Sequence, residues 1–75
     1  MSADTLDARL LAAHAREDKP ALVALYMEAA AAACSAEAEG FYLTHAYIFA
    51  LDIGDARAAL LKARLVEMHR DAPED

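Results

Sequence analysis

The chain has 75 residues, the length of one small domain, and 59% of them are hydrophobic. Twenty-one residues are alanine, whose side chain buries little area, and ten are leucine. Only two glycines and two prolines are present, and this composition excludes collagen, a β-sandwich and a low-complexity linker. So short a chain gains little from burial compared with the entropy lost on folding. Its helices must therefore pack well, or the chain must associate.

The chain is acidic, with thirteen Asp and Glu residues against seven Lys and Arg and a net charge of −6 at pH 7. No two Lys or Arg residues are adjacent, whereas phosphate backbones and anionic membranes are bound by clustered positive charge. We therefore expect neither a nucleic-acid nor a membrane partner. Cys34 is the single cysteine, which excludes an internal disulfide and a cysteine zinc site.

The first residues lack the basic and then apolar segments that are typical of a secreted protein, so we expect a cytoplasmic location. The longest apolar stretch, from Ala29 to Cys34, is too short to span a bilayer. Arginine outnumbers lysine five to two beside the abundant alanine. This composition is common in bacterial proteins.

Apolar residues recur at helical spacing and predict one all-α domain over residues 1–72, with an acidic tail at 73–75. Four helices are expected, at about 5–17, 20–34, 36–53 and 56–70. The short connections between them predict antiparallel neighbours. The chain then forms two helical hairpins, either stacked as in a helical repeat or as a four-helix bundle.

Three breaks separate the expected helices. Pro20 ends the first helix, because a proline displaces the preceding residue from helical geometry. Gly54 can adopt the left-handed conformation that ends the third helix, and Asp55 can cap the fourth. The break between the second and third helices is placed at Cys34–Ser35. One continuous long helix is the alternative there, since the alanines before it are good helix formers.

The expected helices differ in how much of their surface is apolar. The first should begin after a cap at Ser2 or Asp4, and its apolar stripe consists of Leu6, Leu10, Leu11 and Ala13. The second has two adjoining rows, formed by Leu22, Leu25, Tyr26, Ala29 and Ala33 and by Val23, Met27 and Ala30. The fourth places together Leu61, Leu65 and Met68, with Leu60 and Ala59 beside them.

The third expected helix is apolar around most of its circumference, which is typical of a helix in the middle of the packing. Its main face consists of Ala38, Tyr42, Ala46, Phe49 and Ile53, extended by Leu43, Ala50, Tyr47 and Leu51. Gly40, near its start, is expected to let another backbone approach closely.

Two motifs have the spacing of a known helical repeat. One is a turn that consists of Ala50, Gly54, Asp55 and Ala59. The other is a helix with Leu22, Tyr26 and Ala29 at spacings of four and three residues. Both resemble parts of a tetratricopeptide or Sel1-like repeat, although the first-helix Trp-Leu-Gly signature and the closing proline of that family are missing. The resemblance implies antiparallel helical hairpins that bind other proteins in a concave groove. The chain is also similar to short bacterial proteins.

Residues that could carry chemistry are scattered along the chain. His14, His45 and His69 fall on three different expected helices, and none has a histidine partner one turn away. The hydroxyl groups and Cys34 are not flanked by glycines as in a nucleophile elbow. Two glycines are too few for a phosphate-binding loop. We therefore expect no catalytic site, no bound metal and no cofactor.

Four of the five aromatic residues fall within 41–49, and one helix cannot bury all of them. Tyr26 and Phe49 are expected in the core, whereas Phe41 and Ile48 are expected at the surface beside a polar strip. Exposed aromatic and aliphatic residues beside polar groups are typical of binding surfaces. The candidate interaction surface consists of Phe41, Thr44, His45, Ile48 and Asp52.

These features favour a small helical module that binds a protein partner or a second copy of itself. An open groove between the hairpins, rimmed by Phe41, His45 and Ile48, would support this hypothesis. One alternative is an autonomous structural or regulatory helical domain without a groove. Another is a protein that binds a small ligand.

Overall fold

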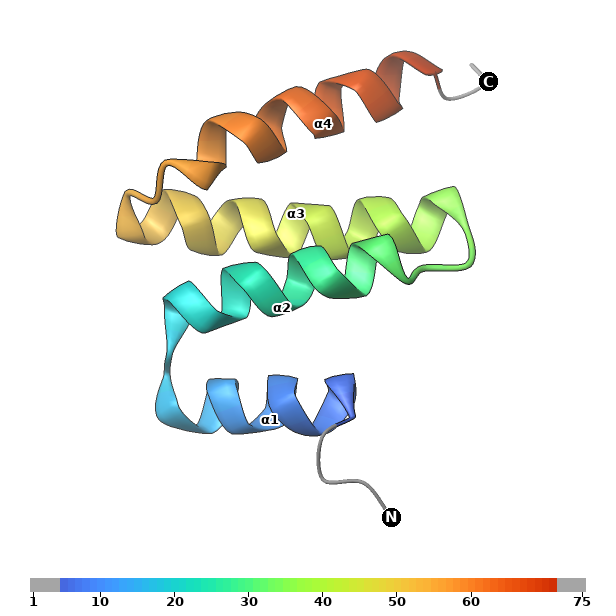
Figure 1. Ribbon diagram of the computed structural model, residues 1–75. Coiled ribbons are helices and arrows are strands. Elements are labelled where there is room, and N and C mark those ends of the chain that lie inside the picture. Colours follow the sequence, from blue (N-terminus) through green and yellow to red (C-terminus); the bar gives the residue numbers. More distant parts are fainter. Residues whose placement is uncertain (1–4, 72–75) are drawn as a thin grey trace.

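The computed structural model describes residues 5–71, which contain four helices and no strand (Figure 1). The helices are α1 (Leu6–Arg16), α2 (Lys19–Ala31), α3 (Ala36–Ile53) and α4 (Arg57–Asp71). Successive helices run antiparallel and form two hairpins, α1–α2 and α3–α4 (Figure 1). The predicted all-α class and the hairpin arrangement are confirmed. The predicted tail at 73–75 lies outside the described residues.

The four helices lie side by side in a single layer. The backbone of each helix comes close only to its neighbours in the chain, and the most extensive packing is that of α2 on α3. The molecule measures 40 × 31 × 16 Å, and its smallest dimension is less than the roughly 20 Å that two stacked layers of helices need. The backbones of α1 and α4 do not come into contact. The described chain is therefore an open array rather than a closed four-helix bundle.

The first helix begins one residue after the polar side chain that caps it. Thr5 is this cap, and its hydroxyl oxygen accepts a hydrogen bond of 3.1 Å from the backbone N–H of Ala8. The predicted caps, Ser2 and Asp4, lie outside the described residues. The helix ends at Arg16, and its C-cap, Glu17, has a φ of 54° in the left-handed region. The prediction that Pro20 ends this helix is wrong, because Lys19, the residue before the proline, is already the first residue of α2.

The second helix starts as the sequence indicates and ends earlier. Asp18 caps it by accepting a hydrogen bond from the Ala21 N–H, and Pro20 lies in the first turn, where no N–H is needed. The helix ends at Ala31, three residues before the predicted end at 34. No residue in the alanine run forces this end.

The break between α2 and α3 is present, which excludes one continuous helix. Ser35 caps α3, and its hydroxyl oxygen accepts a hydrogen bond of 3.1 Å from the Ala38 N–H. The predicted start of the third helix after Ser35 is thus confirmed, whereas the second helix ends before the predicted break at Cys34. Because the chain reverses here, α3 lies antiparallel against α2 (Figure 1).

The turn between α3 and α4 also has the predicted form. Gly54 has a φ of 68° and is the C-cap of α3. Asp55 follows, and its carboxylate accepts hydrogen bonds from the backbone N–H of Arg57 at 2.8 Å and from its guanidinium at 2.7 Å. These hydrogen bonds lower the pKa of Asp55 from its ordinary value of 3.8 to about 2.

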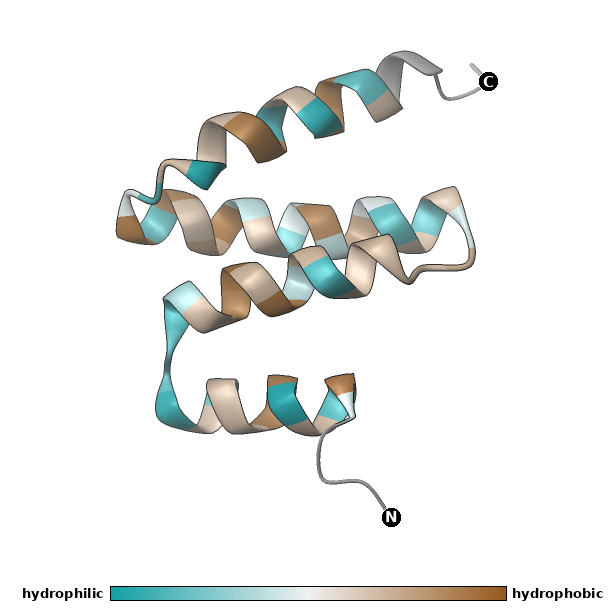
Figure 2. Ribbon diagram, in the orientation of Figure 1, coloured by the Kyte–Doolittle hydropathy of each residue, from teal (hydrophilic) through white to brown (hydrophobic). Residues whose placement is uncertain are grey.

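The core lies between α2, α3 and α4 and contains several alanines. Its buried residues are Val23, Ala30, Leu43, Ala46, Ala50 and Leu61. Larger side chains cover this cluster and remain partly buried, among them Tyr26 and Phe49, which confirms that both pack on the core. In α1, only Ala13 is buried among the described residues. Figure 2 shows most of α2 as apolar and the turn between α1 and α2 as hydrophilic.

Some side chains that were expected in the core are exposed. Leu11 is 71% exposed and Leu60 is 60% exposed, although both belong to or adjoin predicted apolar stripes. In α3 the fully buried face is formed by Leu43, Ala46 and Ala50, whereas Ile53 is 37% exposed. The reason is the single layer: each helix has neighbours on its sides only, so apolar residues that point out of the layer have nothing to pack against.

The expected close backbone approach at Gly40 is wrong. A Cβ atom added at this position would meet only the terminal methyl group of Met68, at an ordinary contact distance of 3.8 Å. The glycine therefore makes no close helix crossing possible, and it carries the propensity cost of glycine inside a helix, roughly 1 kcal/mol.

We predict that the two glycines respond to alanine in opposite directions. Gly40→Ala should raise the free energy of unfolding by up to about 1 kcal/mol, because the new methyl group has room and alanine favours helix. Gly54→Ala should lower it by roughly 1 kcal/mol, because a Cβ is disfavoured at a φ of 68°. Chemical denaturation of both variants measures these changes. Equal effects of the two substitutions would contradict the assigned backbone conformations.

The pKa of Asp55 predicts how stability depends on pH. The folded pKa of about 2 lies below the ordinary 3.8, so the ionised carboxylate stabilises the fold above about pH 4, and this contribution is lost as the pH falls through about 2. The variant Asp55→Asn should lose less stability than the wild type between about pH 5 and pH 2 when both are unfolded with urea. Identical pH profiles would show that the Asp55–Arg57 pair does not form.

Candidate functional site

An aromatic cluster joins three of the four helices on one side of the layer. It consists of His14 from α1, Tyr26 from α2, and Tyr42, His45 and Phe49 from α3. The Tyr26 ring lies between its neighbours, stacked on Phe49 at a centroid distance of 6.0 Å and on His45 at 5.1 Å. Such ring pairs add to the energy of simple burial, by about 0.5–1.5 kcal/mol each.

His14 is the contact by which this cluster holds α1. Its Nε2 atom lies 2.9 Å from the Tyr26 hydroxyl oxygen, and its ring lies edge-on to Phe49 at 6.0 Å. The backbones of α1 and α3 do not touch, so this side chain spans the space between them. Sequence spacing could not reveal this role, because the three partners come from three helices.

A second feature is the face of α3 that points out of the layer, which we call the α3 ridge. It consists of Phe41, Thr44, Ile48 and Leu51. Phe41 is 58% exposed, Ile48 56% and Leu51 55%, which confirms the predicted exposure of the first two. The opposite side of the same helix carries the fully buried Ala46 and Ala50. Sequence reasoning missed Leu51 because the helical wheel placed it beside the apolar face.

Phe41 and Thr44 are held in place by contacts within α3. The Nδ1 atom of His45 donates a hydrogen bond of 2.9 Å to the backbone oxygen of Phe41, and the two rings lie 4.4 Å apart. The Thr44 hydroxyl donates a hydrogen bond of 2.8 Å to the backbone oxygen of Gly40. The ridge therefore presents an aromatic ring that packs on His45. It also presents the Thr44 hydroxyl, whose hydrogen is engaged in a hydrogen bond within α3.

Asp52, the last residue of the predicted surface, forms an ion pair with Lys19 at the start of α2. The hydrogen bond to this carboxylate raises the pKa of Lys19 above its ordinary value of 10.5. The pair ties the end of α3 to the beginning of α2. Its carboxylate charge is thus already compensated, and the structure leaves Asp52 beside the ridge rather than on it.

Hollows between the helices lie away from the ridge. One of about 230 Å³ lies between α2, α3 and α4, with Met27, Leu43 and Leu60 among its lining residues. Another of about 380 Å³ lies near the α2–α3 connection and includes Cys34 and Tyr42. Neither is rimmed by the residues of the expected groove, because Phe41 and Ile48 lie on the outward-facing ridge and His45 belongs to the aromatic cluster.

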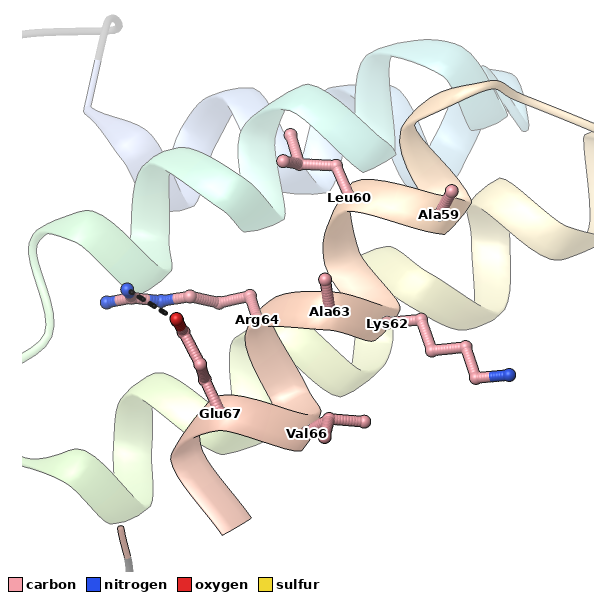
Figure 3. A pocket seen from close by; sticks show the side chains of 7 residues that line it. All are labelled: Ala59, Leu60, Lys62, Ala63, Arg64, Val66 and Glu67. Carbon is pink, nitrogen blue, oxygen red and sulfur yellow. Dashed lines mark ion pairs between the residues drawn. The ribbon is translucent and has the colours of Figure 1, made fainter. Parts of the chain in front are cut away.

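A larger hollow is an open surface of one helix. All seven residues that line it belong to α4 (Figure 3). Figure 3 shows the Arg64 and Glu67 side chains directed toward each other along this helix. A surface made by one helix does not surround a ligand, so we do not assign it a binding site.

The described residues do not form a recognisable catalytic or metal-binding arrangement. No group of three or more His, Cys, Asp or Glu side chains within residues 5–68 could hold a metal ion. The shifted pKa values in this part of the chain belong to ion pairs that link or cap helices.

No protein-family model, curated protein or solved structure matches the chain. None of the described helices is both long and apolar enough to cross a membrane. The geometry of the aromatic cluster and of the α3 ridge is therefore the basis for any functional assignment.

We predict that the aromatic residues on the two sides of α3 contribute unequally to stability. Phe49→Ala should lower the free energy of unfolding by about 3 kcal/mol, because Phe49 packs on the core and on two rings of the cluster. Phe41→Ala should cost less than about 1 kcal/mol, because its ring is mostly exposed. Thermal and urea denaturation of both variants measure these changes in the free energy of unfolding. A larger loss for Phe41→Ala would show that the ridge is part of the core.

Proposed function

We propose that the protein is a small helical protein–protein interaction module and that the α3 ridge is its docking surface. The observation that carries the proposal is the exposure of three large apolar side chains, Phe41, Ile48 and Leu51, in one row on one helix. Water-exposed apolar rows of this kind favour association, because covering them removes apolar surface from water.

The contacts of the Phe41 ring with neighbouring rings of α3 favour the same role. Its ring lies against His45 and Tyr42, at 4.4 and 5.5 Å, so little side-chain entropy remains to be lost on binding. Aromatic residues that are already held in place are frequent centres of binding energy in interfaces. Thr44 adds a neighbour whose hydroxyl is bonded within the helix.

The resemblance to tetratricopeptide and Sel1-like hairpins supports an interaction role as well. Proteins of that family bind other proteins through open arrays of antiparallel helices, and an open array is the arrangement of α1–α4. We infer a protein partner rather than nucleic acid, since the chain has a net charge of −6. The docking surface proposed for this chain differs from the concave groove of the family, because it lies on the outer face of one helix.

The test compares two pairs of serine substitutions. Phe41→Ser with Ile48→Ser alters the ridge, and Leu11→Ser with Leu60→Ser alters apolar residues on α1 and α4 that are at least as exposed. Each double variant is used to capture partners from an extract of cells that produce the protein, and bound partners are quantified by mass spectrometry.

We expect the ridge variant to retain about one tenth or less of the specific partners, as loss of a central apolar contact usually causes. The control variant should retain most of them. Sedimentation velocity on the pure proteins identifies self-association. Equal behaviour of the two variants would contradict the proposed function.

A further inference from the structure

We propose that the α3 ridge receives an amphipathic helix that carries basic residues beside its apolar seam. This inference rests on the proposed function and names the chemistry of the partner. Three observations carry it: the spacing of the ridge residues, the unpaired charge beside them, and the size of the ridge compared with a stable dimer interface.

The spacing of the ridge residues is that of a coiled-coil seam. Phe41, Thr44, Ile48 and Leu51 follow one another at intervals of three, four and three residues, which are the a and d positions of a heptad. Ala46 lies at the outer position of this heptad and is fully buried in the core of the protein. The seam therefore points away from the protein's own packing, where another helix could lie along it.

One unpaired charge lies in line with the ridge, and it is negative. Five of the six Lys and Arg side chains that the structure describes form ion pairs, and Lys62 is the exception. Among the described acidic residues, Asp7, Glu17 and Glu37 have no ion pair. Glu37 is exposed and lies one helical turn before Phe41, in line with the ridge. A Lys or Arg on the partner could pair with it.

The size of the ridge favours a weak contact over a stable dimer, and charge distinguishes a basic helix from a second copy of this chain. Three large side chains, each a little more than half exposed, present roughly 400 Å² together with Thr44. A standard stable interface buries about 800 Å² on each partner. A second copy would also bring another net charge of −6 and another Glu37, whereas a basic helix would reduce the repulsion.

The experiment uses two designed peptides and the full chain. Both peptides have about 21 residues, three heptads, with Leu at a and d and Ala at b, c and f. One carries Lys at e and g, and the other carries Glu at the same positions. Fluorescence anisotropy of the labelled peptides measures the dissociation constant for the wild-type chain and its variants.

We expect the Lys peptide to bind at least tenfold more tightly than the Glu peptide, and its affinity to fall as salt is added. Glu37→Lys should raise the dissociation constant of the Lys peptide about fivefold, and Glu37→Gln should raise it less. Glu17→Lys is the matched control, since it makes the same charge change at the α1–α2 turn, at the opposite end of the layer from the start of α3 (Figure 1). It should weaken binding less than twofold. Thermal melts confirm that each variant is folded.

The outcomes separate this inference from the proposed function. Equal binding of the two peptides, equal effects of Glu37→Lys and Glu17→Lys, or binding of neither peptide would overturn the basic-helix partner. A dimer that is lost in Ile48→Ser would identify a second copy as the occupant and would also overturn it. In each of these cases, loss of captured partners in the ridge variant would still support the proposed function.

Discussion

The packing of α2 on α3 is the contact on which the rest of the structure depends. It is the most extensive contact between helices, and three alanines, Ala30, Ala46 and Ala50, lie in the buried cluster between α2, α3 and α4. Small side chains let two helices approach closely, so backbone and side-chain atoms make many short-range contacts over a small area. Without this pair, α1 and α4 would have nothing to pack on, because they do not touch each other.

This constraint also explains why the molecule is a single layer. In a closed bundle, α1 and α4 would meet and each helix would bury a broad face, which needs large apolar residues at the centre. The buried residues here are small or medium in size, and the largest fully buried side chains are Leu22, Val23 and Leu61. Instead, α1 is attached in part through the aromatic cluster. There His14 and Tyr26 make a hydrogen bond and a ring contact in place of large buried aliphatic side chains.

The same geometry leaves the α3 ridge uncovered. A helix in the middle of a layer has neighbours on two sides and its own buried face between them, so the remaining side faces water. On α3 this side carries Phe41, Ile48 and Leu51 rather than charged residues. In a chain that is 27% charged, three exposed apolar side chains in one row on its longest helix are unusual, and they are the basis of the proposed docking role. The ion pair of Lys19 with Asp52 lies at the end of the row and fixes the position of α3 relative to α2.

The sequence by itself determined the local features. The caps and turns at Ser35, Gly54 and Asp55 followed from the chemistry of single residues, and the outward position of Phe41 and Ile48 followed from helical periodicity. These features depend on interactions within a few residues. Only the tertiary structure revealed the end of α2 at Ala31, because no residue in the alanine run forces a stop.

The tertiary structure also decided which apolar faces are covered. Periodicity shows that a face is apolar, but the number and placement of neighbouring helices determine whether that face is buried. For this reason Leu11 and Leu60 were expected inside and lie exposed. The contacts of His14 with Tyr26 and Phe49 could not be predicted either, since they join residues that are 12 and 35 positions apart in the chain. Such pairs become neighbours only when the antiparallel register of three helices is set.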